Sequence, residues 1–289
     1  RKNWARMSLF VKIIVDNHSQ QDNFLTEHGI CVYVETPTHK CLVDVGASDK
    51  FIRNAEQMGI DIAQIDYLFL SHGHVDHVGG LPFFLKKNAK AKIIFSDKLF
   101  TQQYFSKRHS TRSISLAYTF TEEELNRFMP IQQTAHIEAD IKVIAQIQQN
   151  YPLPQGNRFL YTQAFDDNEF VQDDFSHEIV VCFGSTSLLV CTGCAHNGLL
   201  NMLHTVQNQT SLPIHTVLGG FHLLDADGTY AYETPKEITD IALTLKQTYP
   251  STQFFTGHCT GANSIEILQQ TLSSQLEAFY CGWQKQLNY

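Results

Sequence analysis

The chain has 289 residues, of which 43% are hydrophobic and 17% charged, and its formal net charge is −8. This composition is typical of globular proteins, and the length allows one large domain or two small ones. Proteins that bind a nucleic-acid backbone usually have a basic surface, whereas this chain is acidic. No apolar run approaches the roughly 20 residues that span a bilayer. We therefore expect neither nucleic acid nor a membrane as a partner.

The cysteines indicate a reducing environment. There are seven, an odd number, and they are scattered along the chain. This favours reduced thiols and a cytoplasmic location over a disulfide framework. Cys191 and Cys194 form one Cys-x-x-Cys pair, but no second pair completes a four-thiolate zinc site. We interpret Cys191 as a buried strand residue and Cys194 as a neighbour of the functional site, because a redox pair would need an exposed, activated thiol.

The first hundred residues predict strands and short helices. Apolar segments bounded by turn-forming residues are typical of strands, and five are expected, over 8–15, 30–35, 41–45, 67–70 and 93–95. A short helix is expected over 51–58, closed by Gly59, and another should begin near His77.

The stretch 97–176 has weaker patterns and is rich in Gln, Ser, Thr and Asn. A Glu-Glu-Glu helix start at 122–124 and a Pro-Gly turn near 152–156 predict a helical or irregular insertion. Basic residues stand beside aromatic ones here: Lys98, Lys107, Arg108, Arg112, Arg127, Arg158, Tyr104, Phe105, Tyr118 and Phe159. Such groups could receive an anionic, ring-bearing substrate. The alternative is a solvated insertion with a small satellite core.

Regular patterns resume after residue 176. Strands are expected over 178–183, 188–192, 214–218 and 254–255, the first two as a hairpin. Helices are expected over 198–207, 235–248 and 264–280. Strand runs with helices between and after them favour an α/β sandwich with helices outside.

One stretch, His72-Gly73-His74-Val75-Asp76-His77, concentrates three imidazoles and a carboxylate in six residues. It lies between a predicted strand and a predicted helix, so four ligand-type side chains would converge in one loop. Imidazole and carboxylate together suit zinc, iron or manganese. The alternative is a polar loop whose histidines cluster without binding a metal.

The His-x-His-x-Asp-His pattern resembles the signature of the metallo-β-lactamase superfamily. The Asp44-Val45-Gly46 turn and the stretches 193–196 and 257–259 are similar to its other motifs. A narrower resemblance is to a subfamily of metal-dependent hydrolases related to a pterin-ribofuranosylaminobenzene phosphate synthase. The stretches that carry it are 71–74, 192–196, 219–223 and 258–261.

This resemblance implies an α/β fold, an αββα sandwich with a helical or irregular insertion. We expect one domain over 7–289, with residues 1–6 upstream of it. The insertion at about 97–176 lies between ligand motifs, where loops commonly shape a substrate pocket.

The resemblance also implies a ligand set. His72, His74 and His196 would hold a first metal. Asp76, His77 and His258 would hold a second, and Asp76 would also have a catalytic role. We expect one or two zinc ions, with iron or manganese as alternatives, and hydrolysis by a metal-bound hydroxide that forms near neutral pH.

Two positions leave the role of their side chains open. Many superfamily members place a bridging aspartate where this chain has Cys194. A softer thiolate could bridge two metals, bind one, or stay out. His196 could be a ligand or could instead support one.

Further polar residues have competing interpretations. His222, after Gly219-Gly220-Phe221, could bind metal, act catalytically by hydrogen-bonding a substrate oxyanion, or be a satisfied histidine at a helix start. His28 is similar but more plainly structural. Asp44 is expected to orient a metal-bound histidine. No motif surrounds the remaining candidates, which we expect on the surface or in the core: His109, His136, His177, His204 and His215.

The leading functional hypothesis is a metal-dependent hydrolase of a small ester, lactone, thioester or phosphoester. A metal-holding, ligand-binding scaffold with weak turnover is an alternative, since Cys194 replaces the carboxylate. A pterin-type synthase or transferase is another, suggested by the subfamily. The partner is a small molecule in each case, and the sequence does not indicate the oligomeric state.

Overall fold

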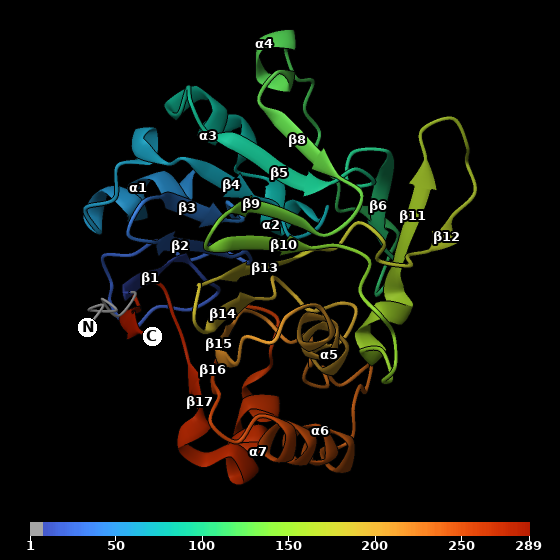
Figure 1. Cartoon of the computed structure of the whole chain (residues 1–289). Helices are drawn as coiled ribbons and strands as arrows, with labels where there is room; N and C mark the ends of the chain where they lie inside the picture. Colours follow the sequence, from blue (N-terminus) through green and yellow to red (C-terminus); the bar gives the residue numbers. More distant parts are fainter. Residues whose placement is uncertain (1–7) are drawn as a thin grey trace, which may run out of the picture.

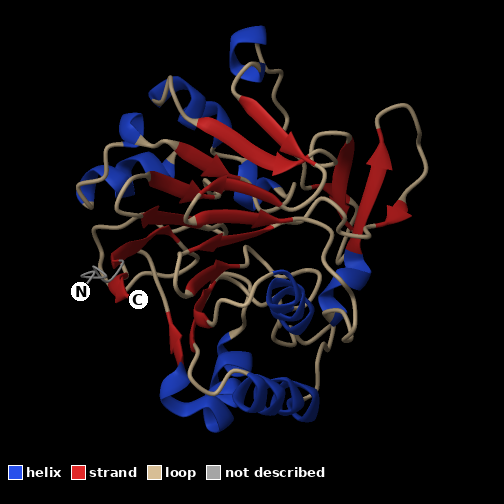
Figure 2. Cartoon of the chain, viewed as in Figure 1, coloured by secondary structure: helices blue, strands red, loops and turns tan. Residues whose placement is uncertain are grey.

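A computed structural model describes residues 8–289, so Met7, the expected first residue of the domain, lies outside the described residues. Two seven-stranded sheets lie face to face, and helices cover their outer faces (Figure 1, Figure 2). This arrangement confirms the αββα sandwich. Between residues 8 and 289, no helix combines the length and the apolar character needed to cross a bilayer.

The first sheet has the strand order β18-β1-β2-β3-β4-β5-β8. Its strands are β1 (Ser8–Val15), β2 (Cys31–Glu35), β3 (Lys40–Val43), β4 (Tyr67–Phe69), β5 (Lys92–Ser96), β8 (Phe128–Ile131) and β18 (Gln284–Asn288). The helices of this half are α1 (Lys50–Gln57), α2 (Val75–Val78) and α3 (Leu81–Lys87), with a 3-10 turn η1 (Ile62–Gln64). Apolar residues of α1 and α3 pack on the outer face of this sheet.

The second sheet has the strand order β17-β16-β15-β14-β13-β10-β9. Its strands are β9 (Ala135–Glu138), β10 (Ile141–Ile144), β13 (Val180–Phe183), β14 (Leu188–Cys191), β15 (Ile214–Leu218), β16 (Gln253–Thr256) and β17 (Leu276–Ala278). Three helices cover its outer face: α5 (Leu199–Gln209), α6 (Pro235–Thr248) and α7 (Ala262–Leu272). A capping box between Thr234 and Glu237 and a proline at the first turn explain where α6 begins.

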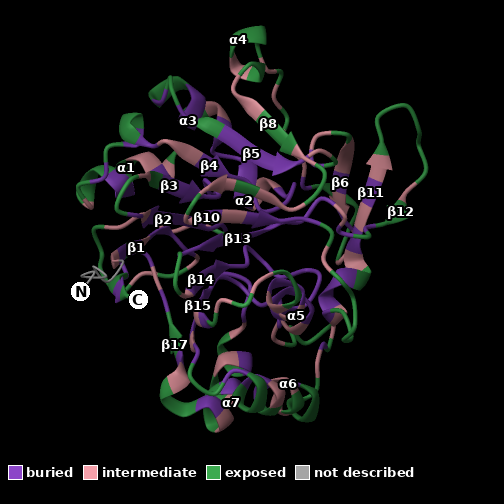
Figure 3. Cartoon of the chain, in the orientation of Figure 1, coloured by how far each residue is buried: buried purple, intermediate pink, exposed green. Residues whose placement is uncertain are grey.

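The main core lies between the two sheets. Alternate residues of β1, Leu9, Val11 and Ile13, face it because successive strand side chains point to opposite faces. Phe69 of the first sheet meets Phe183 of the second edge to face, with ring centroids 5.9 Å apart. Figure 3 shows the central strands as buried, which fits their nearly continuous apolar sequences.

The stretch 97–176 is largely irregular, as expected, but its regular elements are mostly short strands, so the expectation of a helical insertion was wrong in this detail. β8, β9 and β10 extend the two main sheets. A separate small sheet contains β6 (Gln102–Ser106), β7 (Arg112–Ser113), β11 (Leu160–Ala164) and β12 (Val171–Gln172). Helix in this stretch is limited to α4 (Glu122–Leu125) and the 3-10 turn η2 (Gln155–Phe159). β6 pairs with β11 and β10 pairs with β13, partners far along the chain that local patterns do not reveal.

The end of the chain also differs from the expected long helix. α7 ends at Leu272, where Ser273 takes a left-handed backbone angle (φ +51°) that a helix cannot continue. A 3-10 turn, η3 (Ser273–Gln275), then leads into β17, which pairs in parallel with β16. The last strand, β18, had no predicted counterpart and pairs antiparallel with β1.

The motif residues gather at one edge of the sandwich. β3 and β4 run parallel to each other, and so do β14, β15 and β16. The carboxyl ends of these strands therefore point the same way within each sheet, and every motif follows one of them. Ligand sites in α/β proteins commonly lie beyond such strand ends.

Candidate metal centre

The loop after β4 and the short helix α2 deliver the first four candidate ligands. His72 and His74 precede α2, and Asp76 and His77 lie within it. Gly73 lets the loop pass against the ring of Tyr104, because a Cβ at Gly73 would lie 2.3 Å from that ring. The side chains of His72 and His77 are completely buried.

Three imidazoles, those of His72, His74 and His196, face one another. Their ring centroids are 4.6, 4.8 and 4.9 Å apart. The Nε2 atom of each ring is buried and has no hydrogen-bond partner. Burial lowers the pKa of all three side chains, so the rings are neutral near pH 7. We call these three residues the imidazole triad.

Neighbouring side chains orient two rings of the triad. Asn157 accepts a hydrogen bond from Nδ1 of His196 at 3.1 Å, and its amide donates to the carbonyl of the same residue at 2.8 Å. The hydroxyl of Ser71 donates to Asp44, so its oxygen can accept from Nδ1 of His72 at 2.9 Å. In both rings Nδ1 carries the proton, and the lone pair lies on the unpartnered Nε2.

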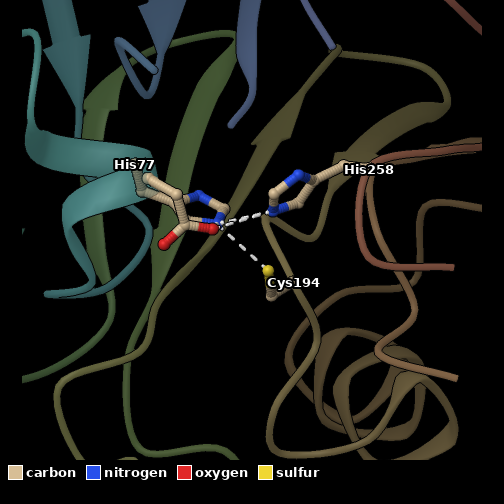
Figure 4. A group of neighbouring side chains, drawn as sticks. His77, Cys194 and His258 are labelled. Atoms are coloured by element: carbon tan, nitrogen blue, oxygen red, sulfur yellow. Dashed lines mark hydrogen bonds and ion pairs between the residues drawn. The ribbon is translucent and has the colours of Figure 1, made fainter. Parts of the chain in front are cut away.

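A second group contains Asp76, His77 and His258. Oδ2 of Asp76 lies 3.3 Å from Nε2 of His77 and 3.1 Å from Nε2 of His258. The two Nε2 atoms are 3.1 Å apart. We call these residues the mixed group; Figure 4 shows His77 and His258 pointing toward each other.

Cys194 joins the triad to the mixed group. Its Sγ lies 3.0 Å from Nε2 of His77, and a dashed line marks this contact in Figure 4. The same sulfur is within 4.8 Å of ligand atoms of His72 and His196, and of Asp76 and His258. A thiolate at this position could reach a metal in either group. This is the position where the resemblance places a bridging ligand.

Asp44 orients the mixed group, as the sequence predicts. Its Oδ2 lies 2.6 Å from Nδ1 of His77, and its Oδ1 accepts from the backbone of Ser71 at 2.8 Å. Burial lowers the pKa of His77, but Asp76 and Asp44 outweigh it and raise that pKa to about 10. Burial raises the pKa of Asp76, yet His77 and His258 hold it well below its usual range. Without metal, the mixed group is therefore an imidazolium between carboxylates.

His258 is held by the loop after β1. Its Nδ1 donates to Oδ1 of Asn17 at 2.9 Å, and its backbone N–H donates to Asp16 at 2.8 Å. Three site residues, Asp44, His222 and His258, adopt left-handed backbone angles (φ +62°, +49° and +53°). Side chains other than glycine adopt such angles at a cost, so the surrounding contacts must impose them.

His222 lies beside the imidazole triad, and its ring centroid is 4.2 Å from that of His196. Both ring nitrogens are buried without a hydrogen-bond partner. Burial lowers the pKa of His222 to about 3, so the ring is neutral. Its ligand atoms also lie within 4.8 Å of Cys194 and Cys259. The geometry is compatible with metal binding or with substrate contact, and it does not fit a satisfied structural histidine.

Three residues outside the predicted ligand set lie at the site. Nδ1 of His177 accepts from the backbone of Gly73 at 3.0 Å, so its Nε2 carries the proton and donates to Asp173 at 3.1 Å. Asp173 in turn lies 3.7 Å from Nε2 of His74. His28 is largely exposed and lies 3.4 Å from Asp76. His177 is thus buried beside the centre, as a support for its loop.

The donor set fits a divalent metal. Buried polar atoms rarely lack partners, and the three Nε2 atoms of the triad have no hydrogen-bond partner. Zinc is usually bound by nitrogen, oxygen and sulfur donors in a tetrahedral or similar geometry. The triad with Cys194 and the mixed group with Cys194 could therefore hold one ion each.

Comparison with known proteins points the same way. The family model described as the metallo-beta-lactamase superfamily matches residues 27–200. An uncharacterized protein of Methanocaldococcus jannaschii is 25% identical over 270 residues, which cover 90% of this chain and 94% of that protein. A second protein of this organism, 7,8-dihydropterin-6-methyl-4-(beta-D-ribofuranosyl)-aminobenzene-5'-phosphate synthase, is 25% identical over 271 residues, 90% of each chain.

A solved structure shows the same fold. Tm1679, described as a metal-dependent hydrolase of the beta-lactamase superfamily, superposes with a TM-score of 0.79. The match covers 97% of this chain and 100% of that one, at 24% sequence identity. At this identity the similarity concerns the fold, while the chemistry must be argued from the side chains.

Proposed function

This chain belongs to the metallo-beta-lactamase superfamily, and from that premise we propose that it is a metal-dependent hydrolase of a small ester, lactone, thioester or phosphoester. The observation that carries the proposal is the imidazole triad, with three buried Nε2 atoms that have no hydrogen-bond partner. The mixed group lies beside it and shares Cys194 with it. Such an arrangement has no structural use without a metal, because unpaired buried polar atoms destabilise a fold.

Zinc is the metal that we propose. Cys194 adds a soft sulfur donor to imidazole and carboxylate donors, and this combination favours zinc over manganese. When bound, the metal would activate water and polarise the bond to be cleaved. The seven cysteines are all free thiols, which supports a reducing, cytoplasmic setting.

The side chains around the metal ligands have separate tasks in this proposal. Asp44 and Asn157 hold the rings of His77 and His196 in the orientation that presents Nε2. Asp76, the carboxylate of the mixed group, would also accept a proton from water. His222, neutral and unpaired, would donate a hydrogen bond to an oxygen of the substrate.

The test combines metal analysis with a substrate screen. Protein purified without chelator is analysed for zinc, iron and manganese, and is assayed on matched ester, lactone, thioester and phosphodiester panels. We expect zinc and turnover on one panel that disappears on chelation and returns with zinc. Metal binding without turnover on any panel would instead favour the ligand-binding scaffold.

A synthase is the second candidate, and one observation favours it. One of the two relatives from Methanocaldococcus jannaschii is named as a synthase, and its 25% identity to this chain extends over 90% of both chains. Carrying out the reaction in ¹⁸O-water distinguishes a hydrolase from a synthase. A hydrolase places the label in its product in a single turnover, whereas a synthase joins two substrates and does not need to.

A further inference from the structure

Two arginines converge on one buried tyrosine outside the metal centre. The guanidinium of Arg158 lies 5.1 Å from the ring centroid of Tyr232, and that of Arg108 lies 5.5 Å from it. Tyr232 is only 5% exposed, and its hydroxyl is buried without a hydrogen-bond partner. We call these three residues the Tyr232 cluster.

No carboxylate of residues 8–289 forms an ion pair with either arginine of the Tyr232 cluster, although Arg108 acts on Asp227 and Arg158 on Glu233 at longer range. The side chain of Arg108 makes no hydrogen bond or ion pair to these residues, and that of Arg158 binds only the carbonyl oxygens of Gln155 and Ala231. The carboxylate of Asp227 forms its ion pair with His109, at 3.5 Å. Burial raises the pKa of Tyr232, and the charges of both guanidiniums act against that rise, whereas the charge of Asp227 adds to it.

Aromatic rings surround the Tyr232 cluster. Phe159 lies 4.6 Å from Tyr230 and 6.4 Å from Tyr232, measured between ring centroids. Such rings can pack against the ring of a ligand, while guanidiniums bind its charged end.

One short turn connects the Tyr232 cluster to the metal centre. η2 contains Gly156, Asn157 and Arg158 in succession. A Cβ at Gly156 would lie 2.8 Å from Nε2 of His222, and Asn157 binds His196. Arg108 also acts on His222 electrostatically, since its charge helps to lower the pKa of that ring. The Tyr232 cluster and the metal centre are therefore linked by a single turn of the chain.

We infer that the Tyr232 cluster is a subsite for the oxyanion end, phosphate or carboxylate, of a ring-bearing small-molecule substrate whose reactive bond lies at the metal centre. Only the placement of the reactive bond at the metal centre rests on the proposed hydrolase function. The binding of the oxyanion end does not depend on it. Arginine suits this task because its planar fork of N–H donors matches phosphate and carboxylate oxygens. The unpartnered hydroxyl of Tyr232 supplies one further donor.

The test measures binding separately from turnover. Phenylphosphonate, which cannot be hydrolysed, benzoate, and the neutral benzyl alcohol are titrated calorimetrically into the metal-loaded protein. The same titrations use Arg108→Ala, Arg158→Ala, Arg158→Lys and the control Arg53→Ala, which removes an exposed charge from α1. Metal content and thermal unfolding show whether each variant keeps its fold.

We expect the parent to bind at least one of the two anions and to bind benzyl alcohol far more weakly. Each alanine variant of the cluster should lose about tenfold or more in affinity, as expected for a lost charge-assisted hydrogen bond. Arg158→Lys should lose less, and Arg53→Ala should match the parent. The comparison of phenylphosphonate with benzoate identifies which oxyanion the subsite prefers.

Equal anion affinity in the parent and in both folded alanine variants overturns the inference, because the anion would then bind only at the metal. Failure of the hydrolase proposal gives a different result. In that case no panel substrate is turned over, yet anion binding still depends on Arg108 and Arg158.

Discussion

The Nε2 atom of His77 lies 3.0 Å from the Sγ atom of Cys194. This contact joins α2 to the loop after β14, and it brings a sulfur to the boundary between the imidazole triad and the mixed group. Cys194 is near ligand atoms of both the imidazole triad and the mixed group. Substituting it should therefore lower metal content more than substituting a residue that belongs to only one of these groups.

Replacing Cys194 tests this role. Cys194→Ala should lower the metal content of the protein, since the ligand shared by both groups is gone. Cys194→Asp restores a hard ligand and should keep the metal content at or above that of the parent, with hydrolysis at least maintained. Elemental analysis and activity of the Asp, Ser and Ala variants provide the measurement. If all three matched the parent, Cys194 would be a packing residue only.

Metal loading should release protons. In the metal-free protein His77 has a pKa of about 10 and burial raises the pKa of the Cys194 thiol, so both are protonated near pH 7.5. Both must lose a proton to bind metal, which predicts a release of about two protons. Calorimetry in buffers of different ionisation enthalpy counts them. Cys194→Ala should release about one fewer, and an unchanged count would exclude the thiolate as a ligand.

Much of the site could be predicted from local sequence because its ligands are close together in the chain. His72, His74, Asp76 and His77 follow one strand within six residues. The structure brings His196, His258 and Cys194 to them, and it places Asp44 against His77. These side chains follow parallel strands, whose carboxyl ends meet at one edge.

The supporting residues could not be predicted in the same way. Asn17, Asn157 and Asp173 hold His258, His196 and His177 through contacts between distant parts of the chain. Nothing in the residues around them marks this role. The short strands between 97 and 176 have the same origin, since pairing across the sheets stabilises them.

Asp44→Asn should weaken metal binding while leaving the fold intact. Asn keeps an oxygen that can accept from the backbone of Ser71, but it removes the charge that orients His77. Loss of such a supporting carboxylate commonly lowers metal affinity about 10- to 100-fold. Competition with a chromogenic chelator measures the affinity. Asp49→Asn, in the same connection before α1, is the control, and equal affinity in both variants would contradict the role of Asp44.

The metal-free protein should lose stability as the pH rises above neutrality. The pKa of His77 is raised in the folded state to about 10 from about 6.5, so its stabilising contribution is complete below 6.5 and is lost as the pH rises through 10. Between about pH 7.5 and 8.5 the titration of His77 should lower the free energy of unfolding by at most about 1.4 kcal/mol per pH unit. Urea unfolding of metal-free protein measures this slope.

Asp44→Asn provides the control for this pH dependence. It removes one of the two carboxylates that raise the pKa of His77, so the slope of its unfolding free energy should be smaller. The metal-loaded protein should also show a smaller slope, because His77 is then neutral throughout. Parallel slopes in all three would mean that His77 does not titrate as the geometry indicates.

His222→Ala separates the two remaining roles of that residue. If His222 contacts the substrate oxygen, the variant should keep the metal content of the parent and lose about a hundredfold or more in kcat, as is typical when one such donor is removed. If it is a ligand, metal content falls together with activity. We expect the first result, because the triad and the mixed group are complete without His222, whereas its two ring nitrogens have no partner within the described chain. His204→Ala on α5 is the matched control, since that imidazole contacts Asn208 and Tyr151 but no candidate ligand. Full activity of His222→Ala on the best substrate would remove His222 from both roles.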